Sequence, residues 1–162
     1  MAGIIEGTTY GLAKNCTIIS VKVVDKRGKG KPEWLRQAIE WATNDAIAKG
    51  VAETSVINIS LGWKYSAKTN HAVKKATNAG ITVVVSVGNQ GKPASTYSPA
   101  SASTAITVAA SGPDNRRAPF SNYGLCVNIF APGTRVPTVP SSVDNGPQYS
   151  SGTSRQQRRY RV

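Results

Sequence analysis

The 162-residue chain has the length and composition of one folded domain. Hydrophobic residues make up 40% of it and aromatic residues 7%, which excludes wholesale disorder. The formal net charge is +12, but four basic residues lie in the last eight positions and the others are dispersed between Lys14 and Arg135. Dispersed basic residues are typical of a solvated surface, so we expect no specific nucleic-acid partner.

The chain carries no sign of a membrane or metal partner. No apolar run approaches the roughly 20 residues that a membrane span needs, and the N-terminal residues do not resemble an export signal, so the sequence leaves localisation open. Cys16 and Cys126 lie outside any CxxC or Cys/His cluster, which argues against a zinc site. They are compatible with one disulfide or with two buried free thiols.

The first third of the chain predicts a strand, a helix and a second strand. The β-branched run 17–24 predicts a strand that ends at a polar turn over 25–30. Apolar residues recur at helical spacing over 32–49, with a proline suited to the first turn and Gly50 at the stop. Residues 55–62 predict the next strand.

The middle of the chain continues the alternation of strands and helices. We expect a helix over 66–79 and a strand over 81–87, whose nearly continuous apolar run is typical of a central strand covered on both faces. Shorter strands are expected at 105–110 and 127–131. The sequence therefore predicts an α/β fold with a mainly parallel sheet and two strand–helix–strand crossovers.

Taken singly, the residues that could carry chemistry are weak signals. Ser154 follows a glycine and a threonine, and a serine hydroxyl in a glycine-cornered turn needs a nearby base to become a nucleophile. The chain has one histidine, His71, which falls inside the second expected helix. We expect it to face solvent.

Five separated motifs are more specific together than any one of them. They are NISLG at 58–62, VGN at 87–89, YSPAS at 97–101, FSNYG at 120–124 and SGTS at 151–154. Their order and spacing resemble those of the subtilisin-like serine proteases (peptidase S8), and within them the proteinase K branch. The resemblance covers residues 2–154 and implies a subtilisin-like three-layer α/β/α fold that is incomplete at both ends.

The resemblance also implies roles for individual residues. Ser154 matches the family's nucleophile, at the start of a helix, and Asn89 matches the side-chain donor of the oxyanion hole. Three residues match the edge segment that pairs with an extended substrate, and three match one wall of the pocket for the residue before the scissile bond. The first set is Ser60, Leu61 and Gly62, and the second is Ser86, Val87 and Gly88.

The chain departs from the family pattern at both ends. The family's catalytic histidine would stand immediately before Met1 and its catalytic aspartate further upstream, so this chain contains neither. We expect residues 1–154 to form a partial peptidase S8 domain and 155–162 an aberrant basic tail in place of an apolar helix. Asn128 stands where the family commonly has a calcium-binding carboxylate, so no cofactor is expected.

These features predict a fragment of a serine endopeptidase that is inactive on its own and whose partner is an extended peptide. The alternatives are a non-catalytic module that binds extended peptides, and a nucleic-acid binder that depends on the basic tail. Missing strands and helices should also expose apolar surface and loosen the fold. Members of this branch are typically secreted or vacuolar.

Overall fold

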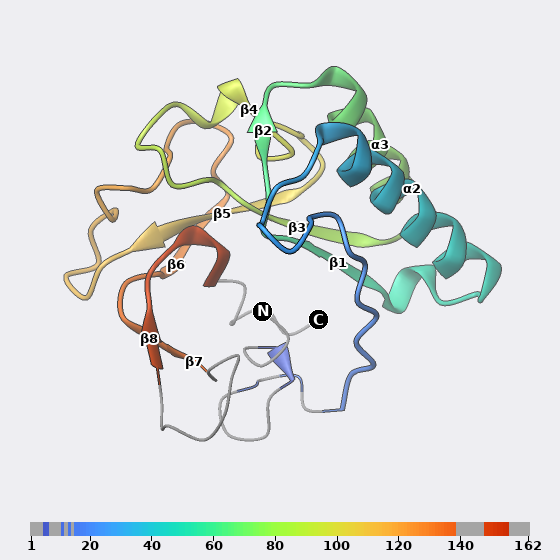
Figure 1. Cartoon of the computed structure of the whole chain (residues 1–162), viewed down its shortest axis with the longest axis horizontal. Coiled ribbons are helices and arrows are strands. Elements are labelled where there is room, and N and C mark those ends of the chain that lie inside the picture. Colours follow the sequence, from blue (N-terminus) through green and yellow to red (C-terminus); the bar gives the residue numbers. More distant parts are fainter. Residues whose placement is uncertain (1–4, 7–10, 12, 14, 139–147, 156–162) are drawn as a thin grey trace.

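The computed structural model describes residues 5–6, 11, 13, 15–138 and 148–155. Its helices and strands follow in the order α2 (Pro32–Ala48), β1 (Val56–Ile59), β2 (Trp63–Lys64), α3 (Ala67–Asn78), β3 (Thr82–Ser86), β4 (Tyr97–Ser98), β5 (Ile106–Ser111), β6 (Ile129–Pro132), β7 (Val136–Thr138) and β8 (Gln148–Ser150). Three short 3₁₀ turns are η1 (Ala52–Thr54), η2 (Ala94–Thr96) and η3 (Thr153–Arg155). Figure 1 shows α2 and α3 side by side on one side of the sheet.

The central sheet has four strands in the order β1-β3-β5-β6, and all three pairings are parallel. This confirms the predicted parallel sheet. Strands β1 and β3 run in register, with Ile57 opposite Val83 and Ile59 opposite Val85. Because parallel strands end at the same edge of a sheet, the segments that follow β1 and β3 emerge next to each other, which is where α/β proteins commonly bind ligands.

The two helices form where the apolar spacing predicts them and cover one face of the sheet. Ser66 caps α3, since its hydroxyl oxygen accepts a hydrogen bond from the backbone N–H of Thr69 at 3.3 Å. The core between helices and sheet consists of apolar side chains from α2, α3, β1 and β3, among them Leu35, Ile39, Ile59, Ala72, Val73, Ala76, Val83 and Val85. This core holds the carboxyl ends of β1 and β3 in place.

The strand predicted over 17–24 is wrong, because no residue in this segment forms a strand. Ile18 and Val21 are exposed, and Ile19 has 57% of its surface open to solvent. β-branched residues favour a strand only when a neighbouring strand supplies hydrogen bonds and packing, and among the described strands β1 pairs with β3 alone. One strand–helix–strand unit, β1-α3-β3, therefore stands where two were predicted.

Two small antiparallel pairs were not predicted. β2 pairs with β4, so that Trp63 lies opposite Ser98, and β7 pairs with β8.

The two cysteines, Cys16 and Cys126, are both free and partly buried. No helix in the described ranges is long and apolar enough to cross a bilayer.

Candidate active site at the carboxyl end of the sheet

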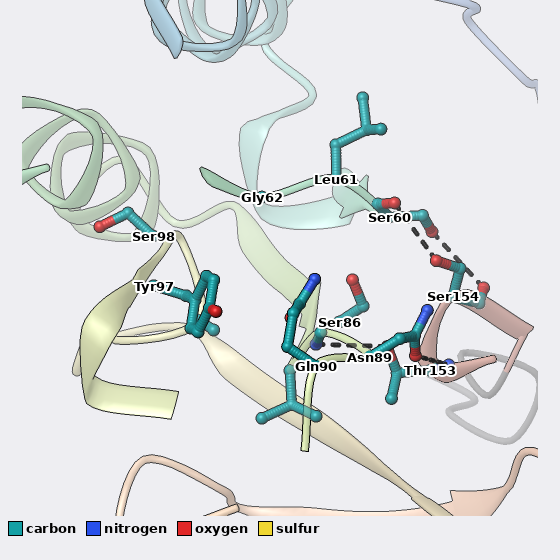
Figure 2. Close-up of a pocket in the computed structure, with 13 residues that line it drawn as sticks. Ser60, Leu61, Gly62, Ser86, Asn89, Gln90, Tyr97, Ser98, Thr153 and Ser154 are labelled. Carbon is teal, nitrogen blue, oxygen red and sulfur yellow. Dashed lines mark hydrogen bonds between the residues drawn. The ribbon is translucent and has the colours of Figure 1, made fainter. Parts of the chain in front are cut away.

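A pocket of about 160 Å³ opens where β1 and β3 end. Its wall includes all the residues that the sequence singled out for substrate and chemistry, which are Ser60, Leu61, Gly62, Ser86, Val87, Gly88, Asn89 and Ser154. Gln90, Tyr97, Ser98, Ala100 and Thr153 complete the wall. The structure therefore brings four segments together, one after β1, one at and after the end of β3, one at β4 and one at η3 (Figure 2).

The Ser154 side of the pocket is joined to the segment after β1. The Ser154 hydroxyl donates a hydrogen bond to the backbone oxygen of Ser60 at 3.2 Å, and the Ser60 hydroxyl donates to the backbone oxygen of Ser154 at 3.5 Å. The two residues are 94 positions apart in the sequence. Ser154 lies in a 3₁₀ turn, is partly exposed and lines the pocket.

The Asn89 side of the pocket is joined to the same 3₁₀ turn. The Asn89 side-chain oxygen accepts a hydrogen bond from the backbone N–H of Thr153 at 2.9 Å, and the Gly88 N–H donates to the Thr153 hydroxyl at 3.2 Å. With its oxygen bound to Thr153, the Asn89 amide presents its nitrogen on the Ser154 side (Figure 2). An NH₂ group in that position can donate to an oxyanion that forms next to the serine.

Among the residues that the structure describes, none that lines this pocket is a proton acceptor for Ser154. Its wall has no histidine, carboxylate or lysine side chain, and a backbone carbonyl such as that of Ser60 cannot remove a proton from a hydroxyl group. His71 is exposed on α3 and is not among the residues that line the pocket, as expected for a helix histidine that faces solvent. The pocket therefore combines a hydroxyl and an amide donor without a base.

The ion pairs between described residues lie along α2 and its C-terminal cap. Arg36 binds Glu33 at 2.8 Å and Glu40 at 2.7 Å. The hydrogen bond from Arg36 lowers the pKa of Glu33, and the same contacts raise the pKa of Arg36. None of these three residues lines the pocket, so its chemistry depends on neutral donors and acceptors.

Asn128 occupies the position where a calcium-binding carboxylate was considered, and its side chain binds the backbone. The side-chain oxygen of Asn128 accepts a hydrogen bond from the Thr107 backbone N–H at 2.8 Å, so it is already used to hold the chain at β5. Within the described ranges no three His, Cys, Asp or Glu side chains gather into a site for a metal ion. Most of the expected basic tail, residues 156–162, lies outside the described residues.

The chain is similar to proteins of a known family. The model of the subtilase family matches residues 1–159. The chain belongs to the subtilase family. It is 44% identical over 154 residues to Subtilisin-like protease 5 of Arthroderma otae and 43% identical over 154 residues to Alkaline protease 1 of Aspergillus clavatus, each match covering 95% of this chain and 38% of the relative.

The subtilase's fold agrees with that assignment. Its structure is similar to the crystal structure of a cold adapted subtilisin-like serine proteinase, with a TM-score of 0.86 and 33% sequence identity, over 97% of this chain and 55% of that one. This confirms the expected subtilisin-like α/β fold. The chain spans about 38% of the length of the curated relatives it matches.

Two residues that build the site were missed at the level of sequence. Thr153 forms hydrogen bonds with Gly88 and Asn89, and Asn122 forms hydrogen bonds with the turn that contains these two residues. Both stand in motifs that were recognised, SGTS and FSNYG, but neither was assigned a role. The available signal was that each motif contains a polar residue with no assigned role. Such a residue indicates a hydrogen bond, but the sequence does not identify its partner.

Proposed function

We propose that this chain carries the peptide-binding wall, the serine nucleophile and the oxyanion donor of a serine endopeptidase, and that the 162 residues alone do not cleave peptides. The observation that supports both parts is the pocket itself. Asn89 is hydrogen-bonded to Thr153, the residue next to Ser154, whereas the described residues of the pocket wall include no base.

The chemistry follows from these groups. An extended peptide would lie along Ser60–Gly62 by backbone pairing, with its carbonyl carbon next to the Ser154 hydroxyl. Attack by the serine oxygen would move charge onto the carbonyl oxygen, which the Asn89 NH₂ group can stabilise. The serine proton needs a base at that moment, and without one the attack stops.

The expected loss of activity is large. Removing the base from a triad of this kind lowers turnover by about 10⁶, a magnitude known from subtilisin, a member of the same family. The 162-residue chain should therefore hydrolyse a chromogenic peptide no faster than its Ser154→Ala variant does, and a fluorophosphonate should label both equally slowly. Turnover clearly above the Ser154→Ala control would contradict the proposal.

The alternative is that the chain works as a module that binds extended peptides. The observation in its favour is that the pocket is formed by neutral residues, and that the Ser154 hydroxyl donates to a backbone carbonyl and not to a base. Both functions require peptide binding, so binding without turnover is the property to measure.

A matched pair of peptides tests this property. A short apolar peptide with a free C-terminal carboxylate should bind about tenfold more tightly than its carboxamide, because a charged oxygen at the Asn89 amide gains more than a neutral one. Asn89→Ala should remove the preference, whereas Asn128→Ala, which alters an asparagine outside the pocket, should keep it. Fluorescence anisotropy measures both affinities, and failure of either peptide to bind would overturn the peptide-binding role.

A further inference from the structure

Asn122 is fully buried, and its side chain is bound to a turn of the chain about 30 residues away. Its NH₂ group donates to the backbone oxygen of Val87 at 2.9 Å and to the side-chain oxygen of Gln90 at 3.0 Å. Its side-chain oxygen accepts from the backbone N–H of Gln90 at 3.0 Å and of Lys92 at 2.9 Å. An amide group has two donor hydrogens and two acceptor lone pairs, so these four bonds use its whole capacity.

The backbone of Asn122 makes a fifth contact with the same turn. Its N–H donates to the Gly88 oxygen at 3.0 Å. Asn122 therefore holds residues on both sides of Asn89, namely Val87 and Gly88 before it and Gln90 and Lys92 after it.

Gly88 permits this close approach. Its φ is +100°, and a Cβ at this position would lie 2.5 Å from the side-chain nitrogen of Asn122. A separation this short is a steric overlap, so the buried amide can reach the turn only because position 88 lacks a side chain. The turn and the amide thus fit each other as one unit.

We propose that Asn122 is a positioning residue for the oxyanion amide, an inference that rests on the proposed function. It fixes the turn 87–92, and the turn aims the Asn89 side chain at Thr153, which precedes the nucleophile. No other amino acid offers two donors and two acceptors on so short a side chain, since aspartate lacks the donors and glutamine is longer. Asn122 itself forms no hydrogen bond with Asn89 or Thr153 among the contacts of the described residues, so it acts through the backbone of the turn.

The Thr153 backbone N–H reports the position of Asn89. It donates to the Asn89 side-chain oxygen across 64 positions of sequence, so its hydrogen exchange should quicken when Asn89 moves. We expect Asn89→Ala to raise its exchange rate about five- to tenfold, the factor of one lost hydrogen bond. Asn122→Ala should give most of the same increase, whereas Asn128→Ala, the matched asparagine control, should leave Thr153 unchanged.

A variant that carries both Asn89→Ala and Asn122→Ala distinguishes two roles of Asn122, namely positioning Asn89 and stabilising the fold in general. If Asn122 acts through Asn89, Asn122→Ala should add nothing to the Thr153 exchange rate in a chain that already carries Asn89→Ala. Amides in β5, such as that of Val108, should keep their protection in the single variant. A full additional increase in the double variant, or an unchanged Thr153 rate in folded Asn122→Ala, would overturn the proposal.

A conservative variant keeps the test decisive if Asn122→Ala does not fold. Asn122→Ser keeps a short hydroxyl that can make part of these hydrogen bonds without burying a charge, so Thr153 should exchange at an intermediate rate. An unchanged rate in this variant would also overturn the proposal. Absence of peptide binding together with the expected exchange pattern would refute the proposed function and leave the role of Asn122 standing.

Discussion

The two sides of the pocket are built in different ways. On the Asn89 side, the buried side chains of Asn122 and Thr153 bind the turn that carries the exposed Asn89. On the other side, Ser154 is partly exposed and its hydroxyl donates to a single backbone carbonyl. The difference shows that the Asn89 side depends on a network of hydrogen bonds from distant segments, whereas the described wall beside Ser154 supplies no side chain that could take its proton.

The largest expected effect comes from filling the space between Gly88 and Asn122. Gly88→Ala places a Cβ against the Asn122 and Gln90 side chains at a φ of +100°, so it should lower the free energy of unfolding by about 3 kcal/mol or more. Gly124→Ala is the matched control, because Gly124 also has a positive φ, +116°, but no atom within 4 Å of the new Cβ.

Urea unfolding of the two variants measures the difference directly. Gly124→Ala should cost about 1–2 kcal/mol, which is the backbone contribution alone. The excess for Gly88→Ala then gives the contribution of the fit between the turn and Asn122. Equal losses would mean that the Asn89 side is no more tightly built than an exposed turn.

A smaller loss of stability is expected when either hydroxyl group of η3 is removed, and the two losses should differ. Thr153 is fully buried, and Thr153→Val leaves the Gly88 N–H without its acceptor, so we expect a loss of about 1–3 kcal/mol. Ser154→Ala removes a hydroxyl that is partly exposed and should cost less than about 1 kcal/mol. Thermal unfolding measures both, and a cost for Ser154→Ala as large as that for Thr153→Val would show that Ser154 supports the fold.

Much of the fold follows from local patterns. Helices α2 and α3 lie where apolar spacing, Pro32 and the Ser66 cap indicate, because those signals act within one or two turns of chain. Strand β3 is recognisable as a buried run for the same reason. The segment 17–24 was wrongly predicted to be a strand. β-branched residues fit well into a sheet, but they form a strand only where a neighbouring strand is available to pair with them.

The site was predictable as a set of motifs but not as a network. Ser154 and Asn89 stand in short motifs with specific spacing, and the structure puts both in one pocket. The hydrogen bonds of Asn122 and Thr153 join residues 30 to 65 positions apart, and a sequence pattern does not specify which distant backbone groups a buried polar side chain will meet. The expected loosening of the fold stays a prediction, although Trp41 and Val56 are about half exposed.

The contacts of η3 join residues that are far apart in the sequence, and this affects when the pocket can form during synthesis of the chain. The bonds from Thr153 and Ser154 return to residues 64 to 94 positions earlier, so the pocket has one of its walls only after residue 154 has been added. During synthesis at about 5–20 residues per second, the segments after β1 and β3 therefore wait several seconds without that wall. A nascent chain stalled before Thr153 would carry all four strands of the central sheet and still lack the wall that contains Ser154.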